Sequence, residues 1–162
     1  MFSYRYGNVG NVKIVTLAPE LDGAIEAIEG LTKEDVVVSM GHTCAALSEG
    51  ERGYDAGAHL ITHLFNAMPS FHHRDPGLVG LLGTTTRQPY WGIIADGIHC
   101  HPSSVKIAYK AHPKGAVLVT DAMCAMGLGE GRHKLGAMEV NITGTEAYLV
   151  GTNTLASNSP PS

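Results

Sequence analysis

The chain has 162 residues, of which 44% are hydrophobic and 16% charged, and its formal net charge is −4 at pH 7. This composition is typical of a compact globular protein, and the negative charge argues against binding of nucleic acid or an anionic membrane. The N-terminus lacks the apolar segment of a signal peptide, and no apolar run approaches the length of a membrane span. Three widely spaced cysteines argue against a disulfide framework or a cysteine zinc finger. We therefore expect a cytoplasmic protein with a small-molecule partner.

Apolar, β-branched runs alternate along the chain with segments of helical periodicity. We expect buried strands over 12–19, 36–40, 59–65, 90–96 and 116–121. Between them we expect three helices: one that begins after Asp22 as its N-cap, one over 45–56, and one over 102–112 that begins with a proline. This alternation predicts an α/β fold with a parallel sheet.

Two further segments depart from this alternation. The stretch 66–88 is long for a connection and rich in proline and glycine, which predicts an ordered functional loop with a short helix. From Lys134 onward, the segments MEVNI and EAYLV are separated by TGT, which predicts an antiparallel hairpin.

Residues that can bind a metal or move a proton follow four of the apolar runs. His63 lies 21 residues after His42, and Asp121 lies 22 residues after His99, an interval that fits one strand, one helix and two connections. Chemistry at the carboxyl ends of successive parallel strands is typical of a (β/α) barrel. A closed eight-stranded barrel usually needs about 250 residues, so the chain can form only part of one.

The residue types at these strand ends suggest metal-assisted chemistry. His42 and His63 are candidate metal ligands because neutral imidazole is a common ligand of divalent zinc. The simpler alternative for any of the nine histidines is a surface or hydrogen-bonded core position. Asp121 could bind metal or accept a proton from water, or it could cap a helix instead. His99 could polarise a carbonyl oxygen.

Six motifs occur together: VTLAPE (15–20), GHT (41–43), THLFNAM (62–68), HRDPGLVG (73–80), GIIADGIHCHP (92–102) and LVTDAM (118–123). Together they closely resemble the N-acetylglucosamine-6-phosphate deacetylase family of the amidohydrolase superfamily. The resemblance covers roughly residues 12–156, and the combination of THLFNAM with RDPG is specific to that family. It implies metal-dependent hydrolysis of N-acetylglucosamine 6-phosphate to glucosamine 6-phosphate and acetate, and a homodimer for the complete family protein.

The resemblance also assigns roles to individual residues. His42 and His63 correspond to ligands of a divalent metal, with zinc as first choice and iron or cobalt as alternatives. Asp121 corresponds to the catalytic acid and base, and His99 to the residue that polarises the acetyl carbonyl. Arg74 matches the arginine that holds the phosphate. The other positions that match substrate-binding residues are Asn66, Ala67, Asp96, Gly97, Ile98 and Leu155.

The chain also departs from the family pattern. The family's third protein ligand is a glutamate in an H-x-E-G-P segment, which does not occur here, and Glu20 is not that residue. We therefore expect a partial barrel, about strands 4 to 8, and a short antiparallel β segment. The expected layout is an unmatched segment over 1–11, the partial barrel over 12–133, a hairpin of the family's small β-sandwich over 134–156, and a disordered tail over 157–162.

The missing glutamate ligand and the missing barrel strands should affect how this chain behaves when it is isolated. We expect a truncated form with an exposed sheet edge at 12–19, poor stability, association, weak metal binding and doubtful activity. One alternative is a catalytically silent fragment that associates with full-length subunits. Another is a different amidohydrolase, such as a dihydroorotase or deaminase, although the phosphate arginine argues against it.

Overall fold

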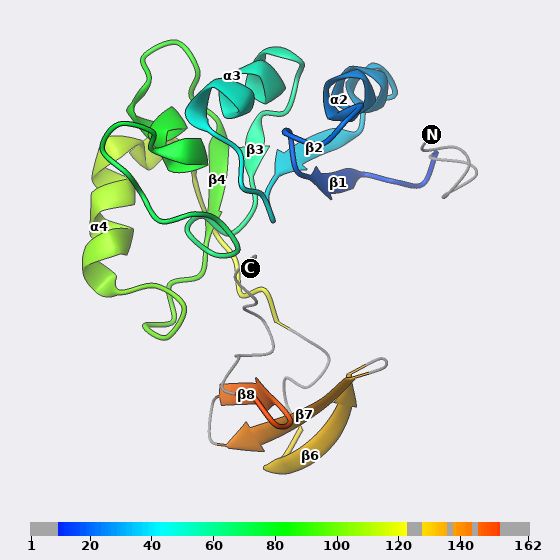
Figure 1. The fold of residues 1–162 in the computed structure, drawn as a ribbon, viewed down its shortest axis with the longest axis vertical. Helices are drawn as coiled ribbons and strands as arrows, with labels where there is room; N and C mark the ends of the chain where they lie inside the picture. The colour runs from blue at the N-terminus through cyan, green and yellow to red at the C-terminus, as the bar shows by residue number, and fades with distance from the viewer. Residues whose placement is uncertain (1–9, 123–127, 136–137, 144–145, 153–162) are drawn as a thin grey trace.

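The main element of the fold is a five-stranded parallel sheet with the strand order β1-β2-β3-β4-β5 (Figure 1). The computed structural model describes residues 10–122, 128–135, 138–143 and 146–152. The strands are β1 (Ile14–Leu17), β2 (Val37–Met40), β3 (Leu60–Ile61), β4 (Tyr90–Ile93) and β5 (Ala116–Leu118). All five expected strands are present, and each is shorter than expected. The predicted α/β class is confirmed.

The connections between strands contain the expected helices. They are α2 (Ala24–Lys33), α3 (Leu47–Asp55), the 3-10 helix η1 (Gly77–Gly83), α4 (Pro102–Ala111) and the 3-10 helix η2 (Pro113–Gly115). The prediction of Asp22 as N-cap of the first helix is wrong, because Gly23 occupies that position with φ 76° and no side-chain cap bond. A tight turn, in which the Ala24 N–H donates to the Leu21 carbonyl at 2.9 Å, delays the helix by one residue.

The sheet buries one of its faces in a single apolar core together with all the longer helices. Val38, Met40, Ile61, Trp91 and Ile93 alternate along the strands and are almost completely buried. The residues in alternate positions face the other way: Ile14, Val37 and Tyr90 are 59%, 49% and 60% exposed there, whereas Ser39 and Gly92 are buried. Among the described residues, therefore, helices cover one face of the sheet and leave much of the other open to solvent.

Helix α3 approaches its neighbours closely at its two glycines, β2 at Gly53 and η1 at Gly50. A Cβ atom on Gly53 would lie 2.6 Å from Met40 Sδ, and one on Gly50 would lie 2.5 Å from Leu78 Cδ2. Glycine costs about 1 kcal/mol of helix propensity relative to alanine. This close packing explains why two glycines occur in one helix.

A second, antiparallel sheet has the strand order β6-β7-β8. Strands β7 (Met138–Thr143) and β8 (Glu146–Leu149) form the predicted hairpin, and Val140 and Ile142 form a small core of their own with Ala147 and Leu149. Strand β6 (Gly131–Leu135) was not predicted, because GRHKL lacks apolar alternation, and the antiparallel part thus begins before Lys134. No helix in the described ranges has the length and apolar character needed to cross a membrane.

Candidate functional site

The carboxyl ends of β2 and β3 bring His42 and His63 together. These strands pair in parallel, with Ser39 opposite Leu60 and Met40 opposite Ile61, so the residues that follow also run side by side. The two Nε2 atoms are 2.9 Å apart, and the ring planes meet at 65°. His63 is buried, whereas His42 is exposed to solvent. The predicted pair therefore presents two nitrogen atoms at one point on the sheet rim.

The donor chemistry of this pair fits a divalent cation. Zinc–nitrogen bonds are about 2.0–2.1 Å long, so one ion can bind both Nε2 atoms. His63 Nδ1 is buried and lacks a hydrogen-bond partner among the residues that the structure describes. Within the same residues, no third histidine, cysteine, aspartate or glutamate completes a metal-binding group. The pair thus supplies two ligands, and Asp121 does not join them as a third.

Unusual backbone conformations concentrate at the same rim. Six non-glycine residues of the described ranges have positive φ, and all but Asp35 follow β2, β3 or β5. They are His42 (50°), His63 (24°), Phe65 (76°), Ala67 (50°) and Asp121 (49°). The left-handed region costs an L-residue about 1–2 kcal/mol, and strain of this kind clusters at functional sites. The backbone therefore marks this rim independently of any motif.

Asp121 lies at the same rim but farther along the sheet. It follows β5 by three residues, and its side chain is exposed. Because all five strands are parallel, their carboxyl ends share one edge of the sheet. Asp121 is therefore on the same side of the molecule as His42 and His63, and residues 123–127 beside it lie outside the described ranges.

The loop after β4 carries His99 in a fixed orientation. Asp96 Oδ2 lies 2.5 Å from His99 Nδ1, and Asp96 Oδ1 accepts the N–H groups of Ile98 and His99 at 2.8 and 2.9 Å. Partial burial raises the pKa of Asp96, but the bonds from the two N–H groups and the His99 ring outweigh it, so the pKa falls below its ordinary value. Gly97 has φ 80° and permits this tight turn. The Asp96 carboxylate thus fixes the conformation of the loop in which it lies and the orientation of the His99 ring.

The predicted Asn66 and Ala67 lie in the turn after β3. Asn66 is buried, and its Nδ2 donates to the Leu64 carbonyl at 3.5 Å and to Cys100 Sγ at 3.6 Å. Burial and the nearby Asp96 charge raise the pKa of the Cys100 thiol, and they outweigh the hydrogen bond from Asn66, which lowers it. The thiol is therefore protonated at neutral pH. The Ala67 carbonyl accepts the Thr43 N–H at 3.1 Å, which joins this turn to the His42 turn.

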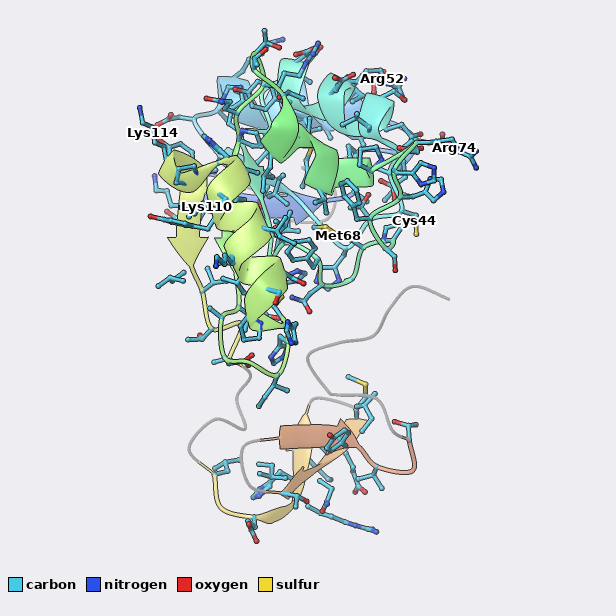
Figure 2. All side chains as sticks on the ribbon, turned by 90° about the vertical axis from the view of Figure 1, so that its left-hand side faces the viewer. Cys44, Arg52, Met68, Arg74, Lys110 and Lys114 are labelled. Carbon is cyan, nitrogen blue, oxygen red and sulfur yellow. The ribbon has the colours of Figure 1, made fainter. Side chains whose placement is uncertain are left out.

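Arg74 projects into solvent from the loop between β3 and η1. Figure 2 shows it at the outer edge of the parallel-sheet unit, on the side where Cys44 also lies. Asp75 anchors this loop, since its Oδ1 accepts the Leu47 N–H at 2.9 Å and the Gly77 N–H at 3.4 Å. The predicted Leu155 lies outside the described residues.

Comparison with known proteins gives this arrangement a context. No family model matches the chain. The N-acetylglucosamine-6-phosphate deacetylase of Bos taurus is 55% identical over 161 residues, which cover 96% of this chain and 39% of that protein. The human protein of the same name is 53% identical with the same coverage. The chain is similar to part of N-acetylglucosamine-6-phosphate deacetylase. The resemblance stated from the motifs is therefore confirmed, for a chain that spans 39% of the length of these deacetylases.

A solved deacetylase also shares the fold of the chain. It is a mutant of the N-acetyl-D-glucosamine-6-phosphate deacetylase of Mycobacterium smegmatis, in complex with N-acetyl-D-glucosamine-6-phosphate. Its TM-score is 0.84 at 37% sequence identity, over 92% of this chain and 39% of that one. The partial length expected from the missing H-x-E-G-P segment agrees with this coverage.

Three residues in the part shared with the deacetylases were not predicted to shape the site. Glu20 and Thr43 hold the His42 turn, and Asp75 anchors the loop that carries Arg74. Glu20 ends the motif VTLAPE and lies 22 residues before His42, close to the 21 residues between His42 and His63, and these were the sequence signals for its position. Hydrogen bonds to residues more than 20 positions away are invisible in the sequence.

Proposed function

We propose that the chain carries two metal ligands, the proton-transfer residue and substrate loops of a metal-dependent deacetylase. The reaction is hydrolysis of N-acetylglucosamine 6-phosphate to glucosamine 6-phosphate and acetate. The observation that carries the proposal is the His42–His63 pair, whose Nε2 atoms meet at 2.9 Å on the rim of a parallel sheet. The names of the relatives and the sugar phosphate bound in the solved neighbour support the choice of substrate.

His42 and His63 would hold the divalent metal, with zinc as first choice and iron or cobalt as alternatives. Such an ion supplies Lewis acidity, which polarises a carbonyl group and makes water acidic enough to lose a proton near neutral pH. A third protein ligand is typical of catalytic zinc sites, and the described residues supply only two. Metal binding by the chain alone is therefore expected to be weak.

Asp121 and His99 would carry out the chemistry at the acetamide. Asp121 accepts a proton from the attacking water, whose oxygen bonds to the acetyl carbon, and returns the proton to the amine nitrogen as the C–N bond breaks. His99 donates a hydrogen bond to the acetyl oxygen, where negative charge develops. Asp96 fixes the His99 ring for this role through the contact between its Oδ2 atom and Nδ1.

The substrate would span the rim from the histidine pair to the exposed loop. Arg74 offers a planar fork of donors that suits the phosphate group. Backbone and side chains of Asn66 and Ala67 would contact the sugar near the phosphate. The remaining contacts are assigned to Asp96, Gly97, Ile98 and Leu155. The Asn66 amide nitrogen is engaged with Leu64 and Cys100, so its contribution would come from its other polar atoms.

We further propose that the parallel sheet is an arc of a (β/α)8 barrel, about strands 4 to 8. The sequential strand order without reversal supports this, because a doubly wound sheet reverses direction at its switch point. The open face would then be the barrel interior. In this layout the barrel arc falls within 12–133 and ends before β6, which begins at Gly131. Residues 1–11 and 157–162 lie outside it, and 134–156 belongs to a small β-sandwich.

Two other points of the proposal concern the setting of the chain. As an alternative to catalysis, the chain is a silent fragment that associates with full-length subunits, since the open sheet face and edges favour association. We also propose that the complete protein is cytoplasmic and dimeric. We propose no nucleic-acid or membrane partner, which the net charge of −4 supports. A dihydroorotase or deaminase is disfavoured by the names of the relatives.

The direct test is acetate release from N-acetylglucosamine 6-phosphate by the purified chain with added Zn²⁺. The enzymatic proposal predicts slow turnover that is lost in Asp121→Asn. The matched control is Asp22→Asn, which changes an exposed aspartate in the connection after β1, at the other end of the strand order. No turnover, together with co-purification of the chain with a full-length deacetylase subunit, would refute catalysis and favour the silent fragment.

A further inference from the structure

A hydrogen-bond network links the end of β1 to the turn that carries His42. Glu20 follows β1, and its Oε1 accepts the Cys44 N–H at 2.7 Å. Its Oε2 accepts the Thr43 hydroxyl at 2.5 Å. The Thr43 hydroxyl oxygen accepts the Ala45 N–H at 2.9 Å in turn. One carboxylate therefore binds two successive residues directly after His42.

The network continues from Thr43 to the turn that carries His63. The Thr43 N–H donates to the Ala67 carbonyl at 3.1 Å, and the Asn66 N–H donates to the His63 carbonyl at 3.0 Å. Thr43 is 1% exposed, so loss of a partner would leave its polar groups buried without compensation. Glu20 and Thr43 thus connect both histidine turns to a third strand end.

The backbone of these turns needs such support. His42 has φ 50° and Ala67 has φ 50°, values that β-carbon sterics disfavour. Strained conformations persist where surrounding contacts over-determine them. Bonds to a charged acceptor are stronger than bonds between neutral groups, so the two bonds that Glu20 accepts can offset strain of this kind.

We propose that Glu20 is a positioning residue that acts through Thr43 to hold His42 against His63. The inference rests on the proposed metal-binding role of the histidine pair and adds to it a residue that touches neither the metal nor the substrate. Groups that orient metal ligands from outside typically change metal affinity by about 10–100-fold when they are removed. Glu20 and Thr43 are expected to have effects in this range.

The variants that test this inference form two matched pairs. Glu20→Ala removes both acceptors, and its control is Glu29→Ala, which removes an exposed carboxylate from α2. Thr43→Val removes the hydroxyl with little change of shape, whereas Thr43→Ser keeps it. Two readouts are needed: the ring NMR signals of His42 and His63 in the metal-free chain, and the affinity for Co²⁺ by titration.

Glu20→Ala and Thr43→Val are expected to shift or broaden both ring signals and to weaken Co²⁺ binding about 10–100-fold, while Glu29→Ala and Thr43→Ser match the unmodified chain. Unchanged ring signals in Glu20→Ala and Thr43→Val would overturn the inference. Loss of folding in both variants would also overturn it, since the network would then have a structural role only. An unmodified chain that binds no Co²⁺ would refute the metal proposal, whereas the ring signals would still decide the positioning role.

Discussion

The two faces of the parallel sheet come from the same strands but have different surroundings. On the helix side, Val38, Ile61 and Trp91 are almost completely buried. On the open side, Val37 and Tyr90 lie next to them in sequence and are largely exposed. The open side is mixed in character, because it also carries the hydroxyls of Thr16 and Ser39, which both contact the Thr62 hydroxyl. Exposed side chains such as Val37 and Tyr90 suit a sheet that is covered on both faces, while the described residues provide the cover for one face only.

The contrast also separates the parts of the molecule that hold the fold from those that present the chemistry. The helix side supplies the packing energy, since its buried residues form one continuous core. The candidate site lies at the rim, where both faces end and the backbone takes positive φ. Changes to the helix side should therefore affect stability, and changes to the open side should affect association.

Replacement of Trp91 is expected to have the largest effect on stability. The indole is fully buried, and its N–H donates to the His112 carbonyl at 2.9 Å. Trp91→Ala should lower the free energy of unfolding by about 3–5 kcal/mol, as measured by urea denaturation. Tyr90→Ala, one residue earlier on the open side, should change it by less than about 0.5 kcal/mol. Similar losses for both variants would contradict the contrast between the faces.

Replacing a closely packed glycine and a glycine with free space around it by alanine should have opposite effects on stability. Gly53→Ala would bring a Cβ atom within 2.6 Å of Met40 Sδ, so we expect overpacking. The free energy of unfolding should fall by about 1–3 kcal/mol. Gly30→Ala in α2 meets no atom within 4 Å and should stabilise the chain by up to about 1 kcal/mol. Thermal melts of both variants provide the measurement, and a stabilising Gly53→Ala would refute the packing argument.

A charge on the open side should reduce association of the chain. Ile14 is 59% exposed on the edge strand β1, where lysine blocks pairing with another strand. Ile14→Lys is expected to shift the chain toward monomer in sedimentation measurements. Ile107→Lys provides the control, because Ile107 is also an exposed isoleucine but lies on helix α4. An equal shift in both variants would show that general surface charge is responsible rather than the sheet edge.

The smallest expected effect concerns pH and Asp96. Its pKa in the folded chain lies below the ordinary value of about 3.9, so its bonds stabilise the fold fully above that pH. This contribution should disappear as the pH falls through the folded pKa. Urea denaturation measures the difference in stability between the unmodified chain and Asp96→Asn. This difference should be constant near neutral pH and should shrink toward zero in acid. A difference that widens in acid would contradict the assignment.

The sequence predicted which strand ends carry the candidate site residues more fully than it predicted the bounds and caps of individual helices and strands. Apolar runs ending at His42 and His63 predicted their meeting, because parallel strands align their carboxyl ends. Asp22 as N-cap was wrong because Gly23 forms a turn that residue preferences alone do not reveal. Strand β6 was missed because its side chains lack alternation, and its pairing with β7 is a tertiary feature.

Two aspects of the site depend on contacts that the sequence does not encode locally. Glu20 meets Thr43 and Cys44 across two strand ends, so its function in the network follows only from the fold. The open face presents the same difficulty, since a β-branched and nearly continuous apolar run such as VKIVTL predicts burial on both sides without showing what supplies the cover. The roles assigned to Asp121, His99 and Arg74 stay predictions.

The central claim, that His42 and His63 form a divalent metal site, is tested most directly by titration of the chain with Zn²⁺. We predict one ion per chain, bound more weakly than about 1 µM because the described residues supply only two protein ligands. His42→Ala and His63→Ala should each weaken binding by at least about tenfold, whereas His73→Ala, an exposed histidine, should not. Zinc affinity that is unchanged in His42→Ala and His63→Ala would contradict the claim.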